Sequence, residues 1–362
     1  MARRVVSVAL AERSYEVVVA PGLEGLGEAV AHATGARRVA LVTDDVVAPL
    51  WAVQAEASLA EAGIASTRLT LPAGEEHKHL QTWATLVDGL LASGVDRRTP
   101  VVALGGGVVG DLAGFAAASA LRGLPMVQVP TTLLAMVDSS VGGKTGFNHA
   151  RGKNLVGAFH QPRLVWAALE TLATLPARER GAGLGEVVKT ALIADAALLA
   201  RLEVLAPALA AGEPDALGEV VARCVAIKAE VVAEDEREGG RRAILNAGHT
   251  AGHALEAALG YGTLLHGEAV ALGLIAELSW ARDEGLLEEA DLPERVTRLV
   301  GALGLPVVAP AADASALGAA LEVDKKSYGN RLTLPITVAA GRTRLVSLAR
   351  ARLPELVASW TA

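Results

Sequence analysis

Strand patterns alternate with helix patterns through the first 130 residues, and this alternation constrains the fold more than any other feature. The predicted strands are Val39–Thr43, Ser66–Leu71, Val101–Leu104 and Met126–Pro130, and the helices between them are Pro49–Ala62, His79–Ala92 and Asp111–Leu121. Such an order is typical of a parallel sheet that helices cover. Two further β-branched runs from Val5 to Pro21 flank Glu12-Arg13-Ser14 and predict a hairpin.

Beyond about residue 170 the pattern becomes almost wholly helical. The predicted helices are Arg178–Glu203, Asp215–Glu236, Ala247–Leu259, Gly267–Glu284 and Leu292–Leu303, followed by a hairpin of Arg331–Val338 with Arg344–Ser347 and a last helix at Leu348–Ser359. At roughly 150 residues per domain, a chain of 362 residues favours two domains. We therefore predict an α/β domain with a Rossmann-like parallel sheet over residues 1–170 and a mainly α-helical domain over residues 171–362.

Composition excludes several classes of protein. With 52% hydrophobic and 20% charged residues, the chain is too apolar to be disordered. The formal net charge of -7, without a long block of Lys or Arg, argues against nucleic acid or an anionic membrane as partner. No uncharged apolar stretch approaches the roughly 18 residues of a membrane span, and no secretory signal is recognisable, so we expect a cytoplasmic protein. The single cysteine, Cys224, is expected to be a buried small hydrophobe.

A glycine-rich turn follows the predicted strand Val101–Leu104. The segment Gly105-Gly106-Gly107-Val108-Val109-Gly110-Asp111 satisfies G-x-G-x-x-G between a strand and a helix. Glycines let backbone N–H groups approach a pyrophosphate at a helix N-terminus. The acidic residue that a dinucleotide fingerprint has roughly 20 positions later is missing, since Gln128–Thr132 stands there. A tight turn explains one or two of these glycines but not three before an aspartate, so the motif favours a nucleotide site.

A segment rich in glycine, hydroxyl groups and lysine comes next. It runs from Asp138 to Gly146, and Lys153 and Asn154 follow. This composition predicts a flexible, donor-rich anion cradle, although a solvated surface loop is the ordinary alternative. The P-loop pattern is not matched, which disfavours an ATPase.

Three of the eight histidines lie within 18 residues. His249 and His253 are four apart and share a helix face, and His266 follows; Glu186 and Lys189, three apart, also share a face. Two or three histidines with a carboxylate are what zinc accepts at a catalytic site. The cluster therefore predicts a metal site, while the spacing leaves open which two histidines bind.

Basic residues accompany these elements, although the protein as a whole is acidic. They are Lys144, Lys153, Lys189, Lys228, Arg242 and Lys325 or Lys326. Their concentration predicts a substrate with two anionic groups, such as a carboxylate and a phosphate. A nicotinamide cofactor, zinc and an anionic substrate together indicate alcohol oxidation.

Eight motifs, in order and over nearly the whole chain, resemble the 3-dehydroquinate synthase family of the sugar phosphate cyclase superfamily. They are Pro72–Lys78, Gly105–Gly114, Pro130–Asn148, Gly152–Gly157, Gly183–Lys189, Arg242–Glu256, His266–Gly273 and Asp324–Lys326. The resemblance implies a lyase of the shikimate pathway that converts 3-deoxy-D-arabino-heptulosonate 7-phosphate into 3-dehydroquinate and phosphate. It also implies that NAD is used and regenerated in each turnover, through transient oxidation, phosphate elimination, reduction and intramolecular aldol closure.

The resemblance also implies residue roles. NAD would be held by Asp44, Glu75, Lys78, Gly106, Gly107, Val108, Val109, Gly110, Asp111, Thr131, Thr132, Asp138, Lys144, Lys153, Thr171 and Thr174. A divalent metal, zinc or else cobalt, would be held by Glu186, His249 and His266, leaving His253 as a substrate or proton-relay residue. Asp138, Lys144, Asn154, Lys189, Lys228, Arg242, Asn246 and Lys325 or Lys326 would contact substrate, with Lys153 beside the nicotinamide. Family members are homodimers, in which Arg122 would reach the phosphate at the partner subunit's site.

Three departures from the family pattern and three alternatives stay open. Ala247, Ala251 and Ala120 stand where the family usually has aromatic residues, which predicts repacking around the metal helix with the polar site intact.

A related cyclase, such as an aminodehydroquinate or deoxy-inosose synthase, would share cofactor and metal. A metal-dependent alcohol or glycerol dehydrogenase would release NADH stoichiometrically. A non-catalytic paralogue would have lost a metal ligand or reactive lysine, which this chain has not.

Overall fold

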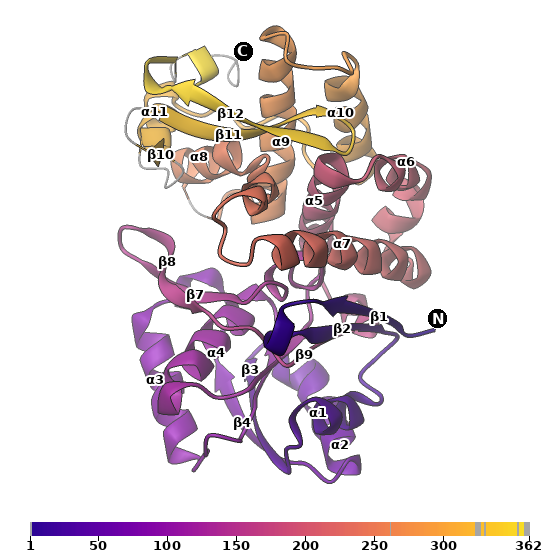
Figure 1. Cartoon of the computed structure of the whole chain (residues 1–362), viewed down its shortest axis with the longest axis vertical. Coiled ribbons are helices and arrows are strands. Elements are labelled where there is room, and N and C mark those ends of the chain that lie inside the picture. The colour runs from indigo at the N-terminus through magenta and orange to yellow at the C-terminus, as the bar shows by residue number, and fades with distance from the viewer. Residues whose placement is uncertain (1, 261, 323–326, 329–330, 353–354, 358–362) are drawn as a thin grey trace. The chain divides into compact units, whose positions relative to one another are not determined.

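The structure is a computed structural model that describes residues 2–260, 262–322, 327–328, 331–352 and 355–357 (Figure 1). Contacts divide the chain into two compact units. The first unit comprises Met1–Pro176 with Lys228–Ala233, and the second comprises Ala177–Ile227 with Glu234–Ala362.

A seven-stranded sheet in the order β1-β2-β9-β6-β5-β3-β4 forms the centre of the first unit. Its strands are β1 (Arg4–Val8), β2 (Tyr15–Ala20), β3 (Arg38–Asp44), β4 (Ala65–Leu71), β5 (Val101–Gly105), β6 (Met126–Pro130) and β9 (Leu164–Ala168). Only β1 and β2 pair antiparallel; the other neighbours are parallel. The predicted hairpin and parallel sheet are confirmed. The sequence pattern does not reveal β9, because a continuous apolar run of five residues has no period.

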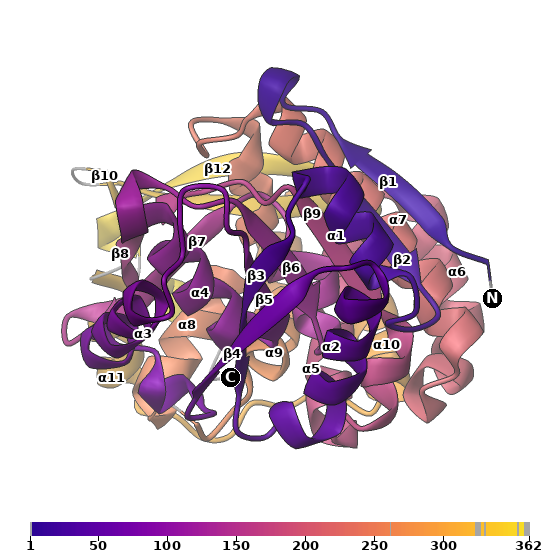
Figure 2. The same ribbon diagram turned by 90° about the horizontal axis from the view of Figure 1, so that it is seen from below.

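Helices cover both faces of this sheet (Figure 2). Helices α1 (Leu26–Thr34) and α2 (Val53–Glu61) pack on one face, and α3 (Leu80–Ala92) and α4 (Gly107–Ser119) pack on the other. The alternation of side chains along β3 shows why both faces are apolar. Val39 and Leu41 lie in the core with α1 and α2, whereas Ala40 and Val42 lie in the core with α3 and α4.

A separate antiparallel pair of strands, β7 (Lys144–His149) and β8 (Gly152–Phe159), carries three of the predicted site residues. Lys144 begins β7, and Lys153 and Asn154 lie on β8. The prediction of a flexible loop is therefore wrong for this part of the segment. Glycine and lysine are poor strand formers, so composition alone favoured a loop.

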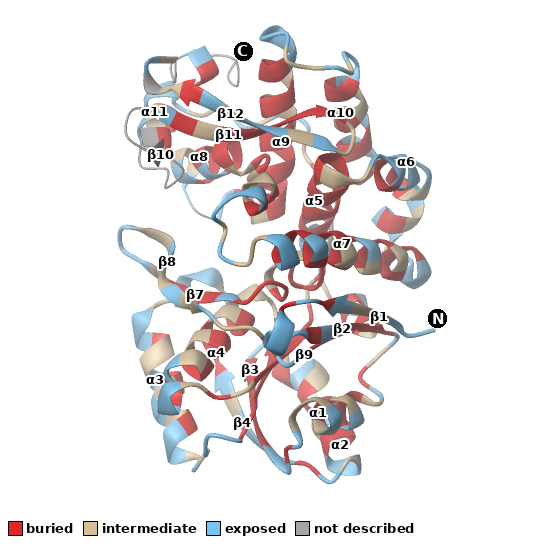
Figure 3. Cartoon of the chain, viewed as in Figure 1, coloured by how far each residue is buried: buried red, intermediate tan, exposed pale blue. Residues whose placement is uncertain are grey.

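The second unit is mainly helical, as predicted from its periodicity. Its elements are α5 (Ala177–Ala194), α6 (Ala196–Ala211), α7 (Pro214–Glu234, with Lys228–Ala233 in the first unit), α8 (His249–Leu259), α9 (His266–Asp283), α10 (Leu292–Ala302), α11 (Ala314–Glu322), β10 (Ser327–Tyr328), β11 (Arg331–Ala339) and β12 (Arg342–Ala349). Figure 3 shows α5 and α9 buried along most of their length. No helix in the described part of the chain is long and apolar enough to cross a membrane.

Two predicted helices differ in the structure. The helix predicted over Arg178–Glu203 is two helices, because the carboxylate of Asp195 accepts a hydrogen bond from the Leu198 N–H at 2.9 Å and starts α6. The last helix cannot begin at Leu348, since that residue belongs to β12, where it faces Leu332 of β11.

Candidate active site

The residues implied to hold NAD lie where parallel strands of the first unit end. Asp44 is the last residue of β3, Gly106 follows β5, and Thr131 follows β6. From β3 the sheet continues to β4 on one side, and from β5 it continues to β6 on the other. Such a switch point, here between β3 and β5, is where open α/β sheets bind ligands. Other implied residues follow β4 (Glu75, Lys78), β6 (Thr132) and β9 (Thr171, Thr174), and Gly107–Asp111 begin α4. Asp138 lies in the helical turn Ala135–Ser139, whereas Lys144 and Lys153 lie on β7 and β8.

The N-terminus of α4 is suited to an anion. Gly106 precedes the helix without a side-chain cap, and the first turn has no acidic residue. The first N–H groups of a helix have no partner within it and attract phosphate. A Cβ atom at Gly106 would lie 3.1 Å from Thr132 Cγ2, and one at Gly107 would lie 3.1 Å from Ser139 Oγ. Larger residues at these two positions would press against Thr132 and Ser139. Glycine avoids these contacts and leaves the first N–H groups of α4 accessible, which fits the pyrophosphate of a dinucleotide.

Two side chains at the strand ends also fit a polar ligand. Asp44 Oδ1 accepts hydrogen bonds from the N–H groups of Val46 at 3.0 Å and Val47 at 2.7 Å, and burial raises the pKa of this carboxyl. The buried hydroxyl of Thr131 has no hydrogen-bond partner among the described residues. A buried polar group is normally satisfied, so Thr131 points to a bound ligand.

Lys78 joins the α4 end to strand β8. Its Nζ lies 2.6 Å from Asp111 Oδ2 and donates to Asn154 Oδ1 at 2.7 Å. Burial alone lowers the pKa of the Lys78 ammonium, but the carboxylates of Asp111 and Glu75 raise it above its ordinary value. Glu75 in turn accepts a hydrogen bond from Asn148 Nδ2 at 2.7 Å. This network keeps Lys78 charged and fixes β8 next to the residues implied to hold NAD.

Lys228, which belongs to the first unit, holds the turn that carries Asp138. Its Nζ donates to both the carbonyl oxygen and the Oδ1 atom of Asp138, each at 2.6 Å. After β9, the hydroxyl of Thr174 accepts a hydrogen bond from Trp51 Nε1 at 2.9 Å, and the hydroxyl of Thr171 donates to the Ala168 carbonyl at 2.8 Å. These contacts order further residues that the resemblance implies for NAD.

In the second unit three helices bring two histidines and a carboxylate together. Glu186 lies on α5, His249 begins α8 and His266 begins α9. Glu186 Oε1 lies 3.5 Å from His249 Nε2 and 3.6 Å from His266 Nε2. His253 shares the face of α8 but is exposed, with its ring centroid 5.4 Å from that of His249. The geometry thus favours His249 and His266 as the pair left open by the spacing.

Glycines let these helices approach backbone to backbone. A Cβ atom at Gly267, next to His266, would lie 1.7 Å from the Ala182 carbonyl oxygen of α5. A Cβ atom at Gly273 of α9 would lie 2.0 Å from the Gly248 carbonyl oxygen, just before α8. No side chain fits at either place, so close packing sets the positions of Glu186, His249 and His266.

Glu186 is suited to a cation. It is 1% exposed and forms an ion pair with Lys189 Nζ. The two residues are three positions apart and lie on one face of α5, as predicted. Apart from this ion pair, neither carboxylate oxygen has a hydrogen-bond partner among the described residues. A buried carboxylate facing two imidazole nitrogens is the donor set of a catalytic zinc site that keeps an open position.

Two acidic residues that sequence reasoning missed support this site. Glu277 of α9 is buried, and its carboxylate accepts hydrogen bonds from the N–H groups of Gly248 at 2.7 Å and Ala251 at 3.4 Å, which caps α8. Asp235, within the helix predicted over Asp215–Glu236, accepts backbone hydrogen bonds at 2.8 to 2.9 Å from Gly239, Gly240 and Arg242. Against the effect of burial, these hydrogen bonds lower the pKa of Asp235. In the sequence, Glu277 is marked only by its charge within the otherwise apolar pattern of α9.

The loop that Asp235 organises carries two predicted substrate residues. Arg242 is buried, and its guanidinium donates to the Glu236 carbonyl. Asn246 Nδ2 donates to Glu238 Oε1 at 2.9 Å. Lys325 and Lys326 lie outside the described residues.

Cys224 is fully buried on α7, as predicted. Burial raises the pKa of its thiol to about 12. The thiol is therefore protonated at neutral pH and has no nucleophilic role. Ala247, Ala251 and Ala120, the departures from the family pattern, are also buried.

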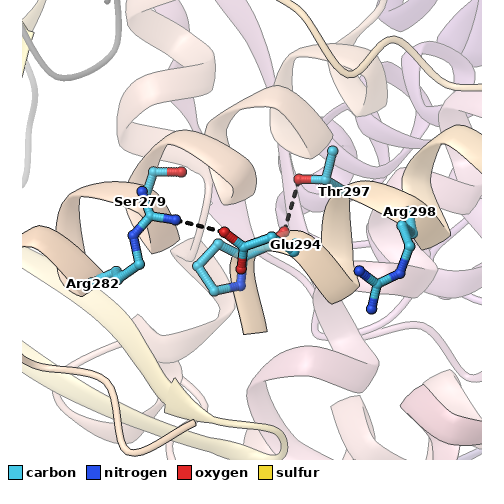
Figure 4. Close-up of a pocket in the computed structure, with 6 residues that line it drawn as sticks. Ser279, Arg282, Glu294, Thr297 and Arg298 are labelled. Atoms are coloured by element: carbon cyan, nitrogen blue, oxygen red, sulfur yellow. Dashed lines mark hydrogen bonds and ion pairs between the residues drawn. The ribbon is translucent and has the colours of Figure 1, made fainter. Parts of the chain in front are cut away.

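A pocket of about 320 Å³ lies between α9 and α10 of the second unit (Figure 4). Arg282 Nη1 donates to Glu294 Oε1 at 2.7 Å, and the Thr297 hydroxyl donates to the Pro293 carbonyl at 2.8 Å. Among the described residues, no predicted site residue lines this pocket.

Comparison with known proteins gives matches over most of the chain. Residues 68–182 match the model of the 3-dehydroquinate synthase N-terminal domain, and residues 183–327 match that of the C-terminal domain. A 3-dehydroquinate synthase of Pelobacter propionicus is 50% identical over 89% of this chain and 90% of its own length. One from Symbiobacterium thermophilum is 54% identical over 83% of this chain and 84% of its own length.

Solved structures of sugar phosphate cyclases are similar to nearly the whole chain. A 2-epi-5-epi-valiolone synthase of Streptomyces hygroscopicus with NAD+ and Zn2+ bound has a TM-score of 0.87 and 35% identity over 97% of both chains. A 2-deoxy-scyllo-inosose synthase complexed with carbaglucose-6-phosphate, NAD+ and Co2+ has a TM-score of 0.85 and 28% identity over 98% of this chain and 99% of its own. A probable glycerol dehydrogenase of Sinorhizobium meliloti, at 18% identity, TM-score 0.65 and 95% coverage of both chains, shares the fold alone.

Proposed function

The chain belongs to the 3-dehydroquinate synthase family, and from this premise we propose that it converts 3-deoxy-D-arabino-heptulosonate 7-phosphate into 3-dehydroquinate and phosphate. The observation that carries the proposal is the set of Glu186, His249 and His266, whose facing atoms lie within 4.8 Å of one another. A chain that had lost its catalytic role would have no reason to keep a buried carboxylate facing two histidines.

The two units supply different parts of the reaction. When bound, NAD accepts and returns a hydride, and the divalent metal, zinc or cobalt, polarises a substrate hydroxyl. In the first unit the α4 end and the strand ends receive the cofactor. In the second unit Glu186, His249 and His266 hold the cation. The cationic side chains of Lys144, Lys153, Lys189, Lys228 and Arg242 bind and orient the carboxylate and phosphate of the substrate.

Lys153 is the side chain that we place nearest the reacting groups. Its neighbour Asn154 is held on both sides, because its side chain accepts from Lys78 and its N–H donates to Asn148 Oδ1 at 2.9 Å. Such a neighbour keeps Lys153 at a defined place on β8.

We expect Lys153→Ala to retain NAD and metal but to lower kcat by about 10²–10⁴-fold, the usual contribution of a positioned acid or base. Steady-state kinetics, with NAD binding and metal content measured alongside, test this. Arg151→Ala, in the exposed turn between the same strands, is the matched control and should leave kcat unchanged. A kcat of Lys153→Ala near that of the control would refute the assignment.

We also propose a homodimer in which Arg122 reaches the partner subunit's site. Leu121 and Arg122 have φ angles of 50° and 65°, so two consecutive residues other than glycine adopt the left-handed conformation. Each such residue costs about 1–2 kcal/mol and is kept where surroundings or function require it. Light scattering should give the mass of two chains; the mass of one chain at micromolar concentration, with full activity, would contradict the proposal.

The substrate is tested by offering two sugar phosphates to the same enzyme. We expect phosphate release from 3-deoxy-D-arabino-heptulosonate 7-phosphate and none from glucose 6-phosphate. The opposite preference would favour the alternative of a related sugar phosphate cyclase. The cytoplasmic address expected from the sequence stays a prediction.

A further inference from the structure

Both histidines that face Glu186 have an acceptor at the other ring nitrogen. His249 Nδ1 lies 3.1 Å from the Ala247 carbonyl oxygen, and His266 Nδ1 lies 3.4 Å from Glu256 Oε2. In both rings it is Nε2 that points to Glu186. The two imidazoles are therefore oriented in the same way by different acceptors.

An acceptor at Nδ1 determines which nitrogen can bind a cation. With the proton held at Nδ1, the lone pair of Nε2 is directed to the cation. For His249 the acceptor is the backbone carbonyl oxygen of Ala247, which no side-chain substitution removes. For His266 it is a carboxylate, and a carboxylate also makes the imidazole a more basic ligand.

The position of Glu256 on α8 explains how it reaches a residue of another helix. Glu256 is seven residues after His249, two turns along the same face of α8, and it is 3% exposed. Helix α9, which begins with His266, packs against α8. Glu256 thus connects the helix that carries one histidine to the imidazole of the other.

We propose that Glu256 is a positioning residue that orients His266 Nε2 toward the metal and strengthens metal binding. This inference rests on the proposed metal-dependent function. A competing use exists, because His253, Glu256 and His266 also place ligand atoms within 4.8 Å of one another and could hold a separate ion. His253 is exposed, and Nδ1 of His266 already lies at hydrogen-bond distance from Glu256 Oε2, so the positioning role is favoured.

The test measures Zn2+ affinity by competition with a chromophoric chelator, starting from the metal-free full chain. We expect Glu256→Ala to bind Zn2+ about 10–100-fold more weakly than the unmodified chain. Glu256→Gln keeps an acceptor without the charge and should lose less. His253→Gln tests the competing use and should bind with unchanged affinity, and His32→Gln, at an exposed position of α1, is the control. Thermal unfolding of each metal-free variant separates weaker binding from misfolding, and Glu256→Gln preserves the test if Glu256→Ala does not fold.

Cobalt gives a second measurement that a merely structural role would not change. Because His266 loses its orientation, the visible absorption bands of bound Co2+ should shift in Glu256→Ala and not in His253→Gln. Unchanged affinity and unchanged bands in Glu256→Ala would overturn the inference. If the unmodified chain bound two ions and both Glu256→Ala and His253→Gln bound only one, the inference would be overturned in favour of the separate ion. If the unmodified chain bound no ion, the proposed metal site itself would be wrong.

Discussion

Replacing His249 with alanine is expected to remove the metal and nearly all activity. The structure provides two imidazole nitrogens and one carboxylate for the cation, so His249→Ala leaves only Glu186 and His266. If polarisation of the substrate by the metal contributes about 4 kcal/mol to transition-state stabilisation, its loss lowers kcat/KM on the order of 10³-fold. Metal analysis of the purified variant and steady-state kinetics check both parts.

The control for this variant is a histidine of the same chain that belongs to neither candidate metal group. His32 is exposed near the end of α1, and His32→Ala should keep both metal and activity. Normal zinc content and turnover in His249→Ala would contradict the assignment of the metal site. Recovery of activity only at high added Zn2+ would agree with it, since a weakened site fills by mass action.

Removing Lys189 is expected to destabilise the metal-free protein severely. Glu186 and Lys189 form an ion pair in which the side chains are 1% and 2% exposed. Removing one partner of such a pair leaves a buried charge uncompensated, which costs about 3–5 kcal/mol. Lys189→Ala should therefore lower the free energy of unfolding of the metal-free chain by this amount, measured by urea denaturation.

Two further measurements separate the ion pair from a packing defect. Adding Zn2+ should restore most of the stability of Lys189→Ala, because the cation then compensates the charge of Glu186. The double variant Glu186→Gln with Lys189→Ala should be more stable without metal than Lys189→Ala alone. A loss below about 1 kcal/mol in Lys189→Ala would show that the ion pair does not compensate the buried charge.

The sequence was informative wherever local periodicity determines position. A spacing of three residues placed Glu186 and Lys189 on one helix face, and the alternation of strand patterns with helix patterns predicted a parallel sheet that helices cover. The spacing of the histidines predicted a cluster but not the ligand pair. That choice depends on the approach of α5 and α9 at Gly267, which no local pattern encodes.

Other features could not be predicted because they depend on contacts between distant segments. Glu256 and Glu277 act across the packing of α8 against α9, ten and 29 residues from the groups they hold. Strands β7 and β8 carry a composition typical of loops, and only their pairing makes them strands. The resemblance supplied the roles of the lysines, which composition alone could assign only to an anionic substrate.

The most direct test of the account is the number of phosphates released per NAD. Enzyme loaded with Zn2+ is given 3-deoxy-D-arabino-heptulosonate 7-phosphate in large excess over NAD, while phosphate and NADH absorbance are followed together. We predict many phosphates per NAD and no net NADH, because the hydride is returned in each turnover. Accumulation of NADH in step with substrate consumption, without phosphate release, would contradict the account and indicate a dehydrogenase.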